Sequence, residues 1–208
     1  MDWKKRALNN YKLYLILDTA VNDHDHLLKV AQQSVSWGVD MIQLRDKKGR
    51  PQDILRFSRS LLGALQDRVP FIMNDRVDLA VAAGASGVHL GQDDVPIAHA
   101  RKMMGPKAII GCSCQSREQA EIAQDQGTDY IGFGSVFKTK TKPDREPLDL
   151  NLLLEVITHL KIPVFAIGGI NPENIDKLYQ RGINRVAVCR AICEAADPKE
   201  AIQQLRKA

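Results

Sequence analysis

The sequence has few of the features that mark membrane, secreted or nucleic-acid-binding proteins. Aromatic residues make up only 5% of its 208 residues, and no apolar run approaches the ~18 residues that a membrane-spanning helix needs. The opening residues, MDWKKRALNN, carry charges but no apolar signal core. The 29 basic and 25 acidic residues are spread along the chain, so the net charge of +4 is too mild and diffuse to indicate nucleic-acid binding. We expect a cytoplasmic protein with no membrane partner, whose charge suits a small anionic ligand.

Cysteine is scarce as well. The four cysteines form two pairs, Cys112 with Cys114 and Cys189 with Cys193, in or just after apolar runs. No histidine stands beside either pair at the spacing of a metal site. We therefore interpret them as small core residues of a reducing compartment rather than as metal ligands or disulfides.

No stretch rich in proline, glycine or serine divides the chain. The nearest to a linker is KTKPDREP at 140–147, which is too short to separate two domains. The sequence therefore predicts a single domain over residues 1–208, with residues 1–10 as an extension before the first strand. The sequence does not distinguish a monomer from a homo-oligomer.

The main pattern is a repeat of short apolar runs with amphipathic stretches between them, at the spacing of a strand and a helix. The runs predict eight strands at 13–17, 41–44, 71–74, 87–90, 108–113, 130–136, 164–169 and 185–189. The stretches between and after them predict helices at 26–37, 53–66, 77–83, 96–104, 117–125, 151–159, 172–180 and 198–207.

Helix-capping signals support these boundaries. Ser116 has Gln119 three residues later, as in a capping box, and Asn171 and Asp197 each precede a proline. Glycines follow several helices, where a left-handed residue is favoured: Gly38, Gly84, Gly127 and Gly182.

Near-continuous apolar strands indicate a parallel sheet that is buried on both faces. Eight strand–helix units favour the closed (β/α)8 TIM barrel of the α/β class. A doubly wound open sheet is the alternative, but its G-x-G-x-x-G signature is missing after the first strand, which ends LILDTA. In a barrel, chemistry takes place at the carboxyl ends of the strands, so polar residues there are the candidates.

The second predicted strand ends in three alternating polar residues, Gln43, Arg45 and Lys47. Alternation along a strand points all three to one side, where two cations suit a multiply charged anion. A ladder of surface charges on a sheet edge is the other interpretation. A closed barrel has no such edge, so we favour the binding site.

Carboxylates follow the next two strands. Asn74 and Asp75 end the third strand, and Asp93 and Asp94 follow the fourth. Carboxylates on neighbouring strand ends suit Mg2+ when substrate phosphates supply its other ligands. Helix capping is the competing role for each aspartate, and it is compatible with metal binding.

The remaining strands end in groups that suit phosphate. Ser113 offers a hydroxyl, Gly168 and Gly169 allow close approach of the backbone, and Arg190 adds a charge. The segment FKTKTK at 137–142 follows the sixth strand and lies between the two groups of anion-binding candidates.

These motifs, in this order and spacing, resemble the thiamine phosphate synthase family over nearly the whole chain. The resemblance is carried by QLRDK, NDRVDLA, GVHLGQDD, G-x-S at 111–113, DYIGFGSVFKTKTK and AIGGI. It implies a (β/α)8 enzyme that joins an aminopyrimidine-methyl diphosphate to a thiazole phosphate, with loss of pyrophosphate. The implied partners are small phosphorylated substrates, and the implied cofactor is Mg2+.

The resemblance also implies a role for each matching residue. Gln43, Arg45 and Lys47 would bind the diphosphate, and Asp75 and Asp94 would hold Mg2+. The remaining residues of the pyrimidine diphosphate site are Asn74, Ser113 and Lys142, and those of the thiazole phosphate site are Thr139, Thr141, Gly169, Cys189 and Arg190. Arg45, Lys47, Ser113 and Lys142 would take part in catalysis, whereas Lys138 and Lys140 are expected to face solvent.

Two positions depart from the family pattern. Arg190 stands where serine is common, and Gln115 stands where histidine is common. A glutamine cannot shuttle a proton near neutral pH, which counts against a related thiazole tautomerase. A non-catalytic protein that binds thiamine phosphates is the third alternative. His89, inside the fourth strand, is expected to be a packed residue rather than a base.

Overall fold

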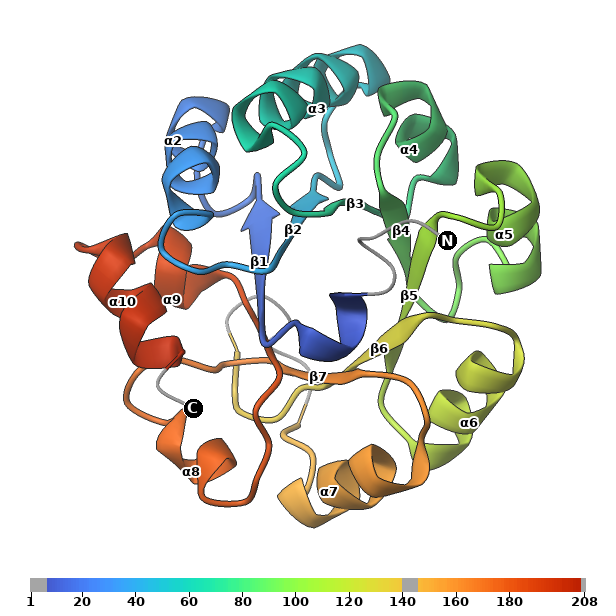
Figure 1. Ribbon diagram of the computed structural model, residues 1–208, viewed down its shortest axis with the longest axis vertical. Coiled ribbons are helices and arrows are strands. Elements are labelled where there is room, and N and C mark those ends of the chain that lie inside the picture. Colours follow the sequence, from blue (N-terminus) through green and yellow to red (C-terminus); the bar gives the residue numbers. More distant parts are fainter. Residues whose placement is uncertain (1–6, 140–145, 207–208) are drawn as a thin grey trace.

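A computed structural model describes residues 7–139 and 146–206, in which eight parallel strands close into a barrel (Figure 1). Each strand pairs with the next along the chain, and β1 pairs with β8 to complete the ring. The closed barrel confirms the (β/α)8 prediction and excludes the open sheet. The strands are β1 Leu13–Asp18, β2 Met41–Arg45, β3 Phe71–Asn74, β4 Gly87–Leu90, β5 Ile109–Cys114, β6 Tyr130–Gly134, β7 Val164–Ile167 and β8 Val186–Val188.

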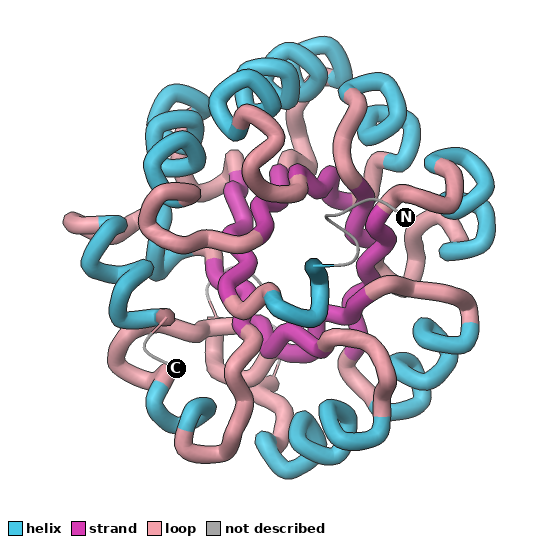
Figure 2. Tube along the Cα trace, in the orientation of Figure 1, coloured by secondary structure: helices cyan, strands magenta, loops and turns pink. Residues whose placement is uncertain are grey.

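Helices surround the ring of strands on the outside, as Figure 2 shows. They are α2 His24–Ser34, α3 Pro51–Leu65, α4 Val77–Ala83, α5 Ile97–Met104, α6 Arg117–Asp125, α7 Leu150–His159, α8 Asp176–Tyr179, α9 Arg190–Cys193 and α10 Pro198–Leu205. Both faces of each strand are therefore covered. In β1, Leu13 and Leu15 belong to the core between strands and helices, whereas Tyr14 and Ile16 belong to the core inside the barrel. This two-sided burial explains why the strand sequences are almost continuously apolar.

The chain before β1 fills one end of the barrel. A short 3-10 helix, η1 Ala7–Asn10, overlaps the centre of the ring in Figure 2. Its Leu8 and the following Tyr11 are buried with Met41, Ile72 and Ile109 in the interior core. The described part of the predicted extension thus covers the amino-terminal end of the barrel, so an internal cavity has room only towards the carboxyl ends of the strands.

The capping signals had different outcomes. The side chain of Ser116 accepts a hydrogen bond from the backbone N–H of Gln119, and that of Asp197 accepts one from Glu200, as predicted. The side chain of Asn171 accepts from the backbone N–H groups of Glu173 and Asn174, as a cap does, but the residues that follow form turns. Regular helix begins only at Asp176 in α8, so the predicted helix start at residue 172 was wrong. The short helix α9, directly after β8, was not predicted.

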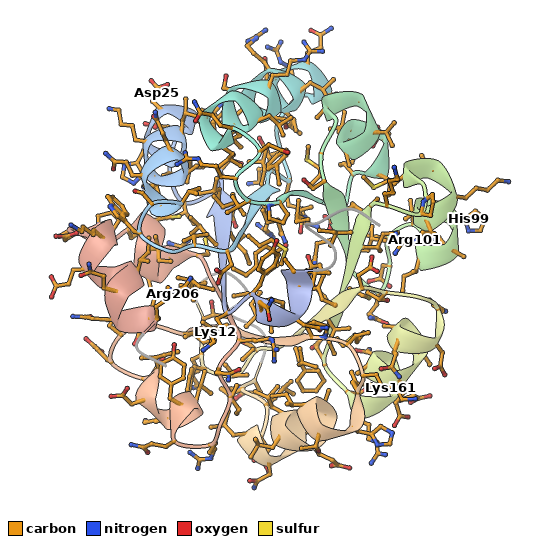
Figure 3. All side chains as sticks on the ribbon, in the orientation of Figure 1. Lys12, Asp25, His99, Arg101, Lys161 and Arg206 are labelled. Carbon is orange, nitrogen blue, oxygen red and sulfur yellow. The ribbon has the colours of Figure 1, made fainter. Side chains whose placement is uncertain are left out.

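Charged side chains are abundant on the periphery. Figure 3 shows Asp25, His99 and Lys161 around the outside of the ring, directed away from the barrel axis. Across residues 7–139 and 146–206, no helix has both the length and the apolar character to span a bilayer.

We expect Gly111→Ala to lower the free energy of unfolding by about 1–3 kcal/mol, the usual cost of overpacking a core. A Cβ atom at Gly111 would lie 2.1 Å from Cζ of Tyr130, which is fully buried inside the barrel. Urea denaturation followed by circular dichroism measures the change.

Gly63→Ala is the matched control. Gly63 lies on the exposed face of α3, and an added Cβ there would have no atom within 4 Å. This variant should be about 0.5–1 kcal/mol more stable, because alanine loses less entropy than glycine in a helix. Equal effects of the two substitutions would contradict the packing described for Tyr130.

Candidate active site

A cavity of about 380 Å³ opens at the carboxyl ends of the strands. All eight strands contribute to its lining, so residues distant in the sequence face one space. The lining includes these predicted site residues: Gln43, Arg45, Asn74, Ser113, Thr139, Gly169, Cys189 and Arg190. Lys47, Asp75 and Asp94 are not among the lining residues, although Lys47 and Asp75 closely follow Arg45 and Asn74, which are. Thr141 and Lys142 fall outside the described residues.

The floor of the cavity is a chain of hydrogen bonds between side chains of five strands. Gln43 Nε2 donates to the Tyr14 hydroxyl at 2.5 Å, and the hydroxyls of Tyr14 and Tyr130 lie 2.8 Å apart. His89 Nδ1 lies 3.0 Å from the Tyr130 hydroxyl, and its Nε2 lies 2.9 Å from Ser113 Oγ. Burial raises the pKa of both tyrosines, which keeps them neutral. The floor is therefore polar but uncharged.

Sequence reasoning found only the two ends of this chain. Tyr14 and Tyr130 were missed because each lies inside an apolar run and could equally be ordinary core. His89 was predicted to be packed, and it is buried, but both of its ring nitrogens are also hydrogen-bonded within the site. One signal was available in the sequence. Side chains alternate between the two faces of a strand, and Tyr14 in β1 and His89 in β4 each occupy a position whose side chain points into the barrel.

Arg45 is held over the cavity by a buried carboxylate. Its Nη1 donates to Asp18 Oδ2 at 2.6 Å, and Asp18 also accepts from the backbone N–H of Ala20 at 2.9 Å. Asp18 is only 2% exposed, so these partners replace the water that its carboxylate loses on burial. The ion pair fixes the guanidinium at the end of β2, where an anion can reach it. Asp18, the last residue of β1, was not among the predicted site residues.

Two carboxyl groups meet in the chain segments that follow β3 and β4. Asp94 accepts a hydrogen bond from the backbone N–H of Gly91 at 2.6 Å, and its side chain is within hydrogen-bonding reach of Asp75. Burial, and then the neighbouring Asp75, raise the pKa of Asp94. Lys47 forms an ion pair with Asp75, whose backbone N–H donates to the carbonyl of His89 at 2.8 Å. Neighbouring carboxylates repel unless a cation lies between them, so this pair is where the described site could hold a metal ion.

Neither aspartate caps the helix that follows it. The N-cap of α4 is Arg76 and that of α5 is Pro96, and neither helix has a side-chain cap. Asp75 itself has φ +59°, a left-handed conformation that costs about 1–3 kcal/mol for a residue with a side chain. The capping interpretation does not hold, and the strained backbone directs the Asp75 carboxylate towards Lys47.

A Gly–Gly turn after β7 positions the loop after β6. Gly168 and Gly169 have φ +107° and +66°, and a Cβ on either would collide, at 2.0 Å with Ser135 Oγ and at 2.3 Å with the carbonyl oxygen of Lys138. The backbone N–H of Phe137 donates to the Gly168 carbonyl at 3.0 Å. Only glycine allows this close approach. The beginning of the FKTKTK segment is thereby fixed against the turn, which brings Thr139 to the cavity.

Arg190 approaches the same region from α9. Its Nη1 pairs with Glu194, whereas its Nε is buried and has no hydrogen-bond partner among the described residues. An unpaired buried N–H of a guanidinium favours an anionic ligand. Cys189 lies beside it and is partly buried. Lys138 is exposed, as expected, but it also borders the cavity.

The four cysteines are free thiols. Cys112, Cys114 and Cys193 are buried, and Cys189 is partly so. Their burial agrees with the interpretation as core residues, and Cys114 and Cys189 also reach the cavity wall.

Comparison with known proteins places this geometry in a family. A family model described as thiamine monophosphate synthase matches residues 13–192. A thiamine-phosphate synthase of Methanobrevibacter smithii is 40% identical, over 96% of this chain and 97% of its own, and one of Syntrophomonas wolfei is 38% identical over 96% of each. The structure of a thiamine phosphate pyrophosphorylase from Pyrococcus furiosus superposes with a TM-score of 0.85 at 35% identity, covering 96% of this chain and 95% of that one. The chain therefore belongs to the thiamine monophosphate synthase family.

Proposed function

We propose that this protein is a thiamine-phosphate synthase of thiamine biosynthesis. It transfers an aminopyrimidine-methyl group from a diphosphate to the ring nitrogen of a thiazole phosphate. The bond from the methylene carbon to the diphosphate oxygen breaks, and a bond from that carbon to the thiazole nitrogen forms. The products are thiamine phosphate and pyrophosphate, with CO2 when the thiazole carries a carboxylate.

The observation that carries this proposal is a single cavity with anion-binding groups on two sides. On one side Arg45 and Asn74 line the cavity, and the residues that follow them in the chain, Lys47 and Asp75, form an ion pair. With Asp94 beside Asp75, this group suits a diphosphate with a metal ion. On the other side lie the Gly168–Gly169 turn and Arg190, which suit a monophosphate. Two phosphorylated substrates bound in this way would bring their reacting atoms together over the polar floor.

The residues present fit Mg2+. Asp75 and Asp94 would hold the ion, and diphosphate oxygens and water would complete its coordination. In the described ranges no three His, Cys, Asp or Glu side chains gather as a metal site, so we assign two carboxylates of these ranges to the ion. Bound Mg2+ supplies positive charge against which the diphosphate can depart.

The chain's own residues supply the rest of the chemistry. Arg45 and Lys47 bind the diphosphate and stabilise the charge that grows on it as the bond breaks. The resemblance assigned Gln43 to the diphosphate, but Gln43 is 2% exposed and lies at one end of the polar floor, so we assign it to the pyrimidine instead. Asn74 and Ser113 orient the pyrimidine with it. The amino group of the pyrimidine stabilises the carbocation that is left behind, so a dissociative displacement requires no protein nucleophile.

The thiazole phosphate is assigned to the opposite side. The backbone of Gly169 and the turn at 189–190 approach its phosphate, with Thr139 beside them. Thr141 is assigned to the same phosphate, and Lys142 to the diphosphate, by the family resemblance. Substrates of this kind agree with the predicted cytoplasmic location and with the expected absence of a nucleic-acid partner, both of which stay predictions.

The direct test is to incubate the protein with Mg2+ and both substrates. We expect a product with the mass of thiamine phosphate, and one pyrophosphate released per product only when both substrates are present. Conversion of the carboxythiazole phosphate alone would instead indicate a tautomerase. Tight binding of thiamine phosphate in calorimetry, without turnover of any substrate pair, would indicate a binding protein.

We expect Asp94→Asn to lower kcat/KM at least about 100-fold, which is typical for loss of one electrostatic contribution to a transition state. The substitution keeps the shape of the side chain but removes the charge that the metal requires. The concentration of Mg2+ that gives half-maximal rate should rise.

Asp93→Asn is the matched control. Asp93 is the preceding residue and is exposed, so its carboxylate is expected to face solvent. This variant should keep its activity and its Mg2+ dependence. If both variants are equally impaired, the assignment of Asp94 to the metal is wrong.

Lys142→Ala should impair diphosphate departure by about 100-fold, because it removes a positive charge from the leaving group. Lys140→Ala removes the same charge two residues earlier, from a position expected to face solvent, and should have little effect. Steady-state rates of pyrophosphate release measure both. Equal damage by Lys140→Ala would overturn the division of FKTKTK into site and surface positions.

A further inference from the structure

The hydrogen-bonded floor links two residues that are far apart on the barrel. The chain runs from Gln43 on β2 through Tyr14 on β1, Tyr130 on β6 and His89 on β4 to Ser113 on β5. It crosses the barrel interior between β1 and β6, which do not pair with each other. Both ends of the chain, Gln43 and Ser113, line the cavity. Whether each end donates or accepts a hydrogen bond therefore depends on the three buried side chains between them.

The bonds of this chain all point in one direction. The amide of Gln43 donates to the Tyr14 hydroxyl, which is 1% exposed and has only one other hydrogen-bond partner among the described residues, Tyr130. A buried hydroxyl proton without an acceptor is costly, so Tyr14 donates to Tyr130. By the same reasoning Tyr130, which is fully buried, donates to Nδ1 of His89.

The direction of the chain fixes the proton on the histidine. Because Nδ1 of His89 accepts, the neutral ring carries its proton on Nε2, and Nε2–H donates to Ser113 Oγ. Ser113 then uses its oxygen as the acceptor for His89. Its own O–H has no acceptor among the described side chains and faces the cavity.

We propose that Tyr14, Tyr130 and His89 are positioning residues that hold Ser113 as a hydrogen-bond donor towards the pyrimidine diphosphate. The identity of that ligand rests on the proposed function. Ser113 is thereby matched to an acceptor atom of the substrate, a ring nitrogen or a phosphate oxygen. At the other end, Gln43 uses its nitrogen in the chain, so its carbonyl oxygen is matched to a donor such as the amino group of the pyrimidine. The chain thus presents one acceptor and one donor to the substrate in a fixed arrangement.

The first test uses the ligand-free protein and needs no substrate. In protein labelled with 15N in histidine, the ring nitrogens of His89 are identified by comparison with His89→Gln. We expect the neutral tautomer with the proton on Nε2. A proton on Nδ1, or a doubly protonated ring near neutral pH, would mean that the chain runs in another direction and would overturn the proposal.

The Tyr130→Phe variant tests the coupling in the same spectra. It removes the donor to Nδ1 while keeping the ring that fills the interior, so His89 should shift towards a mixture of tautomers. Tyr179→Phe is the matched control. It also removes a tyrosine hydrogen bond, the partly buried one from Tyr179 to the Leu205 carbonyl, but on the outside of the barrel. It should leave the spectrum of His89 unchanged, and a spectrum that is unchanged in both variants would contradict the coupling.

A double-mutant cycle separates positioning from mere stability. Tyr130→Phe alone should lower kcat/KM for the pyrimidine diphosphate about tenfold, the worth of one correctly oriented hydrogen bond. In a Ser113→Ala background the same substitution should have almost no further effect, because the hydroxyl that the chain orients is gone. An equal loss in both backgrounds would show a structural role only. If no variant turns over either substrate, the proposed function fails, while the tautomer of His89 still decides the direction of the chain.

Discussion

Closure of the barrel is the constraint on which the rest of the structure depends. The pairing of β1 with β8, from Leu13 opposite Val186 to Leu15 opposite Val188, joins the first and last strands of the ring. Without that pairing the carboxyl ends of the strands would lie along the edge of an open sheet. With it they face a common centre, so that Arg45 on β2 and Arg190 after β8 border one cavity. The location of the site is therefore set by main-chain hydrogen bonding between strands, and the side chains determine what the site can bind.

Three cations of the described part of the site are already paired within the protein. Asp18 binds Arg45, Asp75 binds Lys47 and Glu194 binds Arg190. For a buried pair such as Arg45 and Asp18, the cost of desolvation offsets much of the Coulomb attraction, so the pair adds little net stability. What it provides is orientation, because a guanidinium that is held in place loses little entropy when an anion arrives. On the proposed function, an arriving phosphate would exchange or share partners with these ion pairs rather than fill a pocket of unpaired cations.

The sequence predicted the strands well because burial on both faces leaves almost no polar residue within them. Gln43, Arg45, Asp75 and Asp94 were also predictable as candidates, since each lies in or after an apolar run and stands out there by its polarity. Tyr14, Tyr130 and Asp18 were not predictable, because a tyrosine or a single aspartate in an apolar strand has several structural explanations. Only the register across the ring reveals that these groups meet. Thr141 and Lys142 lie outside the described residues, and their assignment rests on the family resemblance.

The location of the cavity follows from side-chain volume along the strands. Inward positions on β6 pass from Tyr130 near the middle of the barrel to Gly132 and Gly134 towards its mouth. Those on β5 pass from Ile109, in the interior core, to Ser113 at the cavity. Large side chains therefore close the amino-terminal half, whereas small ones leave space at the carboxyl ends. The space is bounded below by hydroxyl, imidazole and amide groups that hydrogen-bond to one another, which lets a polar surface lie directly on an apolar core. A polar heterocycle can then bind inside the barrel, while its charged phosphates remain at the mouth with the cations.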